Sequence, residues 1–213
     1  MIWKGLTPPY RTIVADPPWP AVATPGYVRG VGRRYGAGGR RRRATSLSYS
    51  TMTLEDITDL PVCDLAAENA ALFLWALAPM VREGLATQVV RAWGFQPVGE
   101  IVWAKPNFGL GAFPRPQHEV LIVARRGMLR FSRNDVGSVQ RWPQVYGNNG
   151  GKSHSSKPPA ALDLIESVSP GPYVELFARQ PRLGWDHWGY GFEPPPVAPP
   201  VLPRPRRDPA RTP

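Results

Sequence analysis

The chain has 213 residues, of which 42% are hydrophobic, and it carries a formal net charge of +10. This length and composition are typical of one α/β domain with a sizeable core, and no run of about 18 apolar residues is present that could span a membrane. One cysteine and three histidines exclude an internal disulfide and argue against a structural zinc site, and the single thiol fits a reducing compartment such as the cytoplasm.

The first predicted element is a buried strand over residues 11–15, and other strands are expected over 71–75, 98–103, 119–124 and 173–177. Helical spacing predicts helices over 54–60, 79–93 and 158–168. Thr53 and Asp56 form a capping box for the first helix, Gly94 ends the second, and Ser155 or Ser156 caps the third. Strands that alternate with helices indicate a mostly parallel sheet covered on both faces.

The segments between these elements include two long loops, 20–48 and 106–117, and an irregular stretch over 128–152 with one short strand near 129–131. Residues 29–43 carry seven arginines and no acid, whereas 194–213 carry four arginines and Asp208. The remainder has fifteen basic and fifteen acidic residues and is therefore neutral. Flexible basic segments attract polyanions without reading sequence, so they favour a nucleic-acid partner; the alternative is solubilising disorder.

The sequence Asp16-Pro17-Pro18-Trp19 directly follows the first predicted strand. In open α/β sheets, ligands bind at the carboxyl ends of the strands. Asp16 and the Pro17 carbonyl could accept the two N–H groups of an exocyclic amine, while Pro18 fixes the direction of that carbonyl. Trp19 could stack on a flat base, a contact worth ~1–3 kcal/mol. The alternative is an ordinary turn after a strand.

Residues 10–19, Tyr-Arg-Thr-Ile-Val-Ala-Asp-Pro-Pro-Trp, resemble the signature of the MT-A70 family of adenine-N6 methyltransferases. Further blocks resembling the family follow in order at 49–52, 72–75, 101–105, 109–119, 156–158, 174–179 and 184–189. The resemblance implies a Rossmann-like class I methyltransferase fold with a permuted motif order, and S-adenosylmethionine as the methyl donor. The 109–119 block occurs mainly in prokaryotic relatives, which favours a bacterial or phage enzyme acting on DNA rather than RNA.

The resemblance also implies roles for individual residues. The catalytic residues are Asp16, Pro17, Pro18 and Trp19. The cofactor-binding residues are Asp16, Lys157, Glu175, Phe177, Arg179, Gly189 and Tyr190. The substrate-binding residues are Trp19, Tyr49, Lys105, His118 and Glu119; the charge of the 29–43 segment, and not the resemblance, adds Arg40, Arg41, Arg42 and Arg43.

Several of these roles have structural alternatives. Lys157 and Lys105 could be surface lysines, Glu175 and Arg179 could pair with each other, and Tyr49 could belong to the core. Trp75 and Trp103 are expected in the core of the sheet. Tyr190 stands where the family often has an asparagine, and the 29–43 segment is longer and more basic than the corresponding family loop.

The sequence thus predicts a methyltransferase domain over 1–193 and a Pro/Arg-rich tail over 194–213. The expected activity is transfer of a methyl group to the N6 amine of adenine in nucleic acid, without a metal or a membrane. A non-catalytic nucleic-acid-binding subunit of the same fold remains an alternative, as does methylation of another planar amine. The oligomeric state is left open.

Overall fold

The computed structural model describes residues 2–20, 51–108, 113–144 and 156–189. Within these ranges one sheet of seven strands runs through the middle of the domain in the order β5-β3-β4-β2-β1-β6-β7. Its strands are β1 Tyr10–Ala15, β2 Ala66–Leu77, β3 Gln96–Ala104, β4 His118–Arg126, β5 Val139–Gln140, β6 Tyr173–Leu176 and β7 Trp185–Trp188. The helices are α1 Leu54–Thr58, α2 Ala78–Arg82, α3 Leu85–Ala92 and α4 Pro159–Val168, with a short 3-10 turn at Val62–Asp64.

The sheet is mostly parallel, as the sequence predicts. Strand β1 pairs in parallel with β2 and with β6, β6 with β7, and β3 with β5. Only β4 runs against its two neighbours, β2 and β3. Because of that reversal, the amino end of β4 lies at the same edge of the sheet as the carboxyl ends of β1, β2, β3 and β6. The Rossmann-like layout therefore brings five chain segments to one edge.

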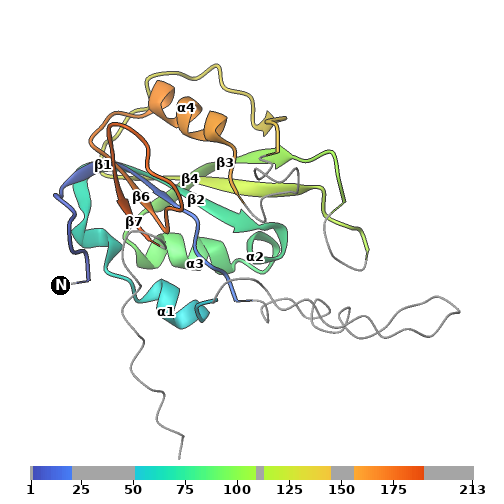
Figure 1. The fold of residues 1–213 in the computed structure, drawn as a ribbon, viewed down its shortest axis with the longest axis horizontal. Helices are drawn as coiled ribbons and strands as arrows, with labels where there is room; N and C mark the ends of the chain where they lie inside the picture. Colours follow the sequence, from blue (N-terminus) through green and yellow to red (C-terminus); the bar gives the residue numbers. More distant parts are fainter. Residues whose placement is uncertain (1, 21–50, 109–112, 145–155, 190–213) are drawn as a thin grey trace, which may run out of the picture.

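Helices cover both faces of the sheet (Figure 1). Helices α1, α2 and α3 pack on one face, with Ile13, Leu72 and Leu74 among the sheet residues of that core. Helix α4 packs on the other face against Trp75 and Trp103, each 2% exposed, which confirms that these two tryptophans belong to the core. Burying aliphatic and aromatic side chains on both faces holds the layers together.

The predicted start of α1 is confirmed. The Asp56 N–H donates to Thr53 Oγ1 at 3.0 Å, and the Thr53 N–H donates to Asp56 Oδ2 at 3.1 Å, which completes a capping box. Gly94, with φ of +84°, follows the end of α3 as expected.

Four local predictions are wrong. The helix expected over 79–93 is two helices, α2 and α3, because Gly84 adopts a φ of +73° between them. The short strand expected at 129–131 is instead β5, which pairs with β3. Strand β7 was not predicted, and the residue that caps α4 is Pro158 instead of Ser155 or Ser156. The 20–48 loop, apart from its first residue, lies outside the described residues.

Candidate active site

The Asp-Pro-Pro-Trp motif lies at the edge of the sheet where the five segments meet. Asp16 directly follows β1, whose residues from Thr12 to Ala15 are fully buried. The described residues that surround Asp16 enclose a small cavity of about 40 Å³; they are Pro17, Pro18, Trp19, Leu77, Glu119, Lys157 and Arg179. Six of these seven, all except Leu77, were predicted from the sequence together with Asp16 as catalytic or binding residues.

Charged side chains pair with one another across this cavity. Lys157 Nζ lies 2.7 Å from Asp16 Oδ1 and 3.3 Å from Glu119 Oε2, so one ammonium group joins two carboxylates. Lys105 forms a second ion pair with Glu119, and Arg179 lies 3.6 Å from Asp16 Oδ2. The site therefore holds positive and negative groups that alternate in space. The carboxylates come from the end of β1 and the start of β4, and the cations come from the segments after β3, before α4 and after β6.

Lys157 is not a surface lysine. Its side chain is 15% exposed, and it immediately precedes the Pro158-Pro159 pair that begins α4. Burial alone would lower the pKa of Lys157, but the carboxylates of Asp16 and Glu119 more than offset that and raise it. The ammonium is consequently kept charged in a poorly hydrated position, where it can hold an anionic group.

Glu119 is stabilised as a carboxylate by the same arrangement. Burial would raise the pKa of Glu119, yet the nearby ammonium groups of Lys157 and Lys105 lower it below its ordinary value. Side chains alternate along a strand, so His118 points to the opposite side of β4 from Glu119 and is exposed. The structure thus brings Glu119 to the cavity but leaves His118 outside its lining.

The aromatic end of the motif is held firmly. Trp19 is 6% exposed, and its Nε1–H donates to the Trp75 carbonyl at 2.9 Å. The Pro17 carbonyl accepts the Trp19 N–H at 2.8 Å, and the Pro18 carbonyl accepts the Met52 N–H at 3.0 Å. The Pro17 oxygen that was predicted to face a substrate amine therefore already holds one internal hydrogen bond, and a carbonyl has one further lone pair to offer.

The end of β6 supplies the expected cofactor side of the site. Phe177 has a φ of +63°, the only positive value at a non-glycine position in the described residues. Its ring packs edge-on against the Trp188 ring, with 5.4 Å between the ring centres. Gly189 has a φ of +155°, and a Cβ there would lie 2.5 Å from the Ala178 nitrogen. Only glycine fits this approach, which brings the end of β7 against the Phe177–Arg179 turn. Local strain of this kind is common at functional sites.

Glu175 lies on the α4 face of the sheet, next to Asp16 and between β1 and β7. Burial and then the negative charge of Asp16 raise the pKa of Glu175 to about 7, against partial compensation from Arg182, Lys157 and Arg179. The pKa of Glu175 is thus higher in the folded protein than its ordinary value of 4.5 in the unfolded chain. The contribution of Glu175 to the free energy of unfolding is therefore fully present below pH 4.5 and is lost as the pH rises through about 7.

We expect Glu175→Gln to remove that pH dependence. The shift corresponds to at most about 3 kcal/mol of unfolding free energy, so the variant should be more stable than the wild type at pH 8 and close to it at pH 5. Denaturant unfolding at several pH values measures this difference. Parallel curves for the two proteins from pH 5 to pH 8 would contradict the assignment of a strained carboxyl at this position.

The remaining predicted site residues divide into two groups. Lys105 follows β3 and is half-buried, with its Nζ 4.3 Å from the centre of the Trp103 ring, so it too is no free surface lysine. Tyr49, Tyr190 and the arginines from 40 to 43 lie outside the described residues, and their predicted roles stay predictions.

Two features of the site were not predicted. Leu77, at the carboxyl end of β2, forms part of the cavity wall. The ion pair between Lys157 and Glu119 was also missed, although Glu119 is the first of four consecutive buried residues in β4. In the described ranges, no group of three or more His, Cys, Asp or Glu side chains is placed to hold a metal, and no helix is long and apolar enough to cross a membrane.

Residues 10–191 match the family model described as MT-A70. The chain is 29% identical to the type II methyltransferase M.MunI of a Mycoplasma species, over 84% of this chain and 76% of that protein. It is 29% identical to the N(6)-adenine-specific methyltransferase METTL4 of Homo sapiens, over 84% of this chain and 37% of that protein. It is 27% identical to the N6-methyladenosine RNA methyltransferase MTA1 of Pyricularia oryzae, over 85% of this chain and 46% of that protein. The chain thus spans three quarters of the first relative and less than half of the other two.

Proposed function

The chain belongs to the MT-A70 family, whose members are N6-adenine methyltransferases, and from this premise we propose that it transfers a methyl group from S-adenosylmethionine to the N6 amine of adenine in DNA. The observation that carries the proposal is the position of Asp16. Its carboxylate lies at the carboxyl end of β1, beside two cationic side chains, Lys157 and Arg179. An acceptor for an amine N–H and cations for an anionic cofactor group are therefore adjacent.

The residues present fit the expected donor. Lys157 is a charged, mostly buried ammonium that could hold the carboxylate of the amino-acid moiety, and Arg179 offers a more exposed guanidinium nearby. Glu175 is a carboxyl group at the end of β6, where it could accept hydrogen bonds from ribose hydroxyl groups. When bound, S-adenosylmethionine would supply an electrophilic methyl group attached to a sulfonium.

Asp16 would act on the amine itself. The lone pair of an adenine N6 amine is delocalised into the ring, so the amine is a weak nucleophile. A carboxylate that accepts one N–H favours the geometry in which the lone pair points toward the methyl group, and it stabilises the positive charge that develops on nitrogen. Trp19, held by its bond to the Trp75 carbonyl, would present a fixed wall against the base. Catalysis would then rest on positioning and electrostatics.

The cavity in its present form is smaller than these ligands. Small-molecule pockets usually have volumes of about 300–1,000 Å³, whereas this cavity has about 40 Å³. Lys157 and Arg179 each form an ion pair with Asp16, and these contacts join the residues that line the cavity. A ligand carboxylate could take the place of Asp16 as the partner of Lys157, which would free Asp16 for the amine and widen the site in one step.

DNA is favoured over RNA by the 109–119 block, which resembles prokaryotic relatives, and the chain covers 76% of M.MunI, which is named a type II methyltransferase. The RNA methyltransferase MTA1 is covered over 46% of its length. A basic loop over 20–48 would gather the nucleic acid. The main alternative is a non-catalytic nucleic-acid-binding subunit, which is disfavoured because Asp16 and Trp19 are both present.

The test is incubation of the full chain with donor labelled in its methyl group and with DNA or RNA of mixed sequence. We expect label in the DNA, and mass analysis of the nucleosides should identify N6-methyladenine. Nucleic-acid binding without transfer to any substrate would support the non-catalytic subunit. Label on cytosine or on RNA alone would overturn the choice of base or of nucleic acid, respectively.

A further inference from the structure

A second, larger cavity lies next to the catalytic one. It has a volume of about 390 Å³ and is lined by residues 104–106, at the end of β3, and by residues 141–144, just after β5. Its volume falls within the range of about 300–1,000 Å³ that is typical of ligand sites. The roles proposed above for Asp16, Trp19 and Lys157 in methyl transfer make no use of this pocket.

The walls of this cavity are fixed by specific contacts. The Trp103 Nε1–H donates to the Trp142 carbonyl at 2.9 Å, and the Trp142 ring packs edge-on against Trp75 at 6.3 Å. Asn107 Nδ2 donates to Gln144 Oε1 at 3.2 Å, which joins the two segments. The pocket is therefore built on the core of the sheet, and a bound group would meet a preformed surface.

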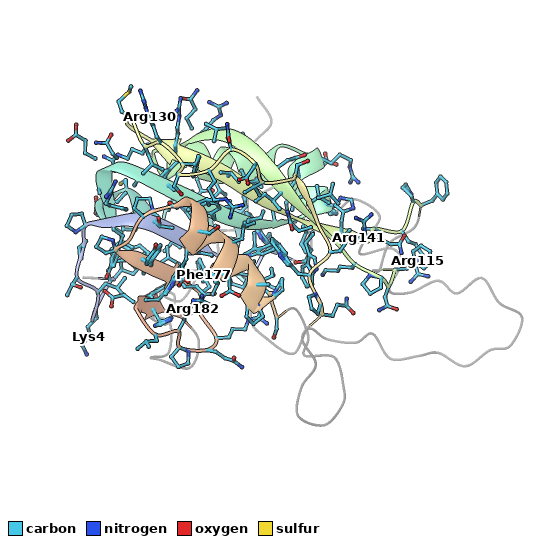
Figure 2. All side chains as sticks on the ribbon, turned by 90° about the horizontal axis from the view of Figure 1, so that it is seen from above. Lys4, Arg115, Arg130, Arg141, Phe177 and Arg182 are labelled. Atoms are coloured by element: carbon cyan, nitrogen blue, oxygen red, sulfur yellow. The ribbon has the colours of Figure 1, made fainter. Side chains whose placement is uncertain are left out.

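The chemistry of the lining suits a nucleotide. Two of the seven lining residues, Lys105 and Arg141, are basic, none is acidic, and Trp142 with two prolines provides a flat apolar wall. A third cation, Arg115, lies 5.2 Å from the ring of Phe108, next to Asn107. Figure 2 shows Arg115 and Arg141 toward the same end of the molecule, whereas Arg130 lies at the opposite end. Sites for single-stranded nucleic acid combine such cations with aromatic surfaces.

Lys105 also connects this cavity with the catalytic site. This lysine lines the larger cavity, and its ammonium pairs with Glu119, which lines the smaller one. A target adenine beside Asp16 would therefore place its neighbour along the strand within reach of Arg141 and Trp142. Enzymes that modify a base either extrude it from the duplex or act on a single strand, so the neighbouring nucleotide must be held as well.

We propose that this cavity binds the nucleotide adjacent to the target adenine, with its phosphate at Lys105 and Arg141 and its base against Trp142. The proposal rests on the proposed function, because it assumes that an adenine in a strand occupies the catalytic site. It adds a subsite that would hold the strand in register and give the enzyme a preference for the base on one side of the adenine.

The first test compares Arg141→Glu with Arg130→Glu, a matched charge reversal at an exposed arginine at the far end of the molecule. With single-stranded adenine-containing oligonucleotides, Arg141→Glu should raise KM by about tenfold or more, with kcat changed less than about twofold, and should lower the salt dependence of binding by about one phosphate. Arg130→Glu should leave KM, kcat and the salt dependence of binding unchanged. Equal effects of the two substitutions would overturn the proposal.

The second test uses the wild-type protein with a photoreactive 5-iodouracil placed in turn on each side of the adenine. Cross-linking from one adjacent position only, to a peptide containing residues 141–144, is expected. Cross-links from every position, or to other peptides, would overturn the subsite. Cross-linking at 141–144 by a protein that transfers no methyl group would support the subsite while contradicting the proposed function, so the two failures can be told apart.

Discussion

Replacing Asp16 by alanine should lower kcat for methyl transfer by roughly 10²–10³-fold, the usual cost of removing one preorganised group at the charge-developing centre. The variant loses the carboxylate that would hold the N6 amine. The other carboxylate of the described cavity lining, Glu119, pairs with two lysines, Lys157 and Lys105. The measurement is the single-turnover rate with saturating donor and oligonucleotide.

Folding must be controlled in this experiment, because Asp16 is also a partner of a mostly buried lysine. Removing one member of a buried ion pair can cost about 3–5 kcal/mol of stability. Asp16→Asn is the matched variant: it keeps the shape and one acceptor oxygen but not the charge. We expect it to fold like the wild type and to retain more activity than the alanine variant. Wild-type rates in a folded Asp16→Ala protein would contradict a catalytic role for Asp16.

Features encoded in a short stretch of sequence were predictable. Strand β1 is a run of buried residues, and the motif that follows it must lie at the edge of the sheet, so the place of Asp16 follows from local pattern alone. The Thr53–Asp56 capping box is likewise a local signal. Such features depend on few neighbours, which is why they could be recognised before the structure.

Features that depend on distant partners were not predictable. Strand β7 has four residues and forms because β6 offers it a free edge and because Trp188 packs against Trp3 and Phe177. The break between α2 and α3 reflects a single glycine inside an otherwise helical pattern. For β7, tertiary contacts decide between conformations that the local sequence permits. For Gly84, the helical spacing of the neighbouring apolar residues outweighed a glycine signal in the prediction.

The charge pairs of the site belong to the second kind. Lys157 and Asp16 are separated by 141 positions in the sequence, and Glu119 reaches them only because β4 runs antiparallel to its neighbours. The individual residues could be nominated from the family resemblance. That these side chains pair with one another, in addition to any ligand they bind, follows only from the topology of the sheet.

Replacing Lys157 by methionine should weaken binding of the methyl donor by roughly 10–150-fold, because a hydrogen bond to a charged group contributes about 1.5–3 kcal/mol. Methionine keeps an unbranched side chain of similar length, so packing before α4 should change little. Calorimetric titration of the protein with S-adenosylmethionine, without nucleic acid, measures the dissociation constant. Unchanged donor affinity would contradict the assignment of Lys157 to the donor carboxylate.

The same variant should change the pH dependence of stability in a defined direction. In the wild type the lowered pKa of Glu119 stabilises the fold above its unfolded value of 4.5, and this contribution is lost as the pH falls through the folded value. Without Lys157 the pKa of Glu119 should rise, because burial then outweighs the remaining lysine. The variant should therefore lose more stability at pH 7 than at pH 5, as thermal unfolding at the two pH values would show.

Lys105→Met is the matched control, because Lys105 also pairs with Glu119 but approaches it from the larger cavity. It should raise KM for the oligonucleotide and leave the dissociation constant of the donor within about twofold, since it loses contact with phosphate and not with the donor. If both substitutions weakened the donor equally, Lys157 would act only as one of two positive charges near Glu119. If Lys157→Met weakened only the binding of the donor and Lys105→Met only that of the oligonucleotide, each lysine would serve one substrate. Glu119 would then be the shared anion that positions both lysines.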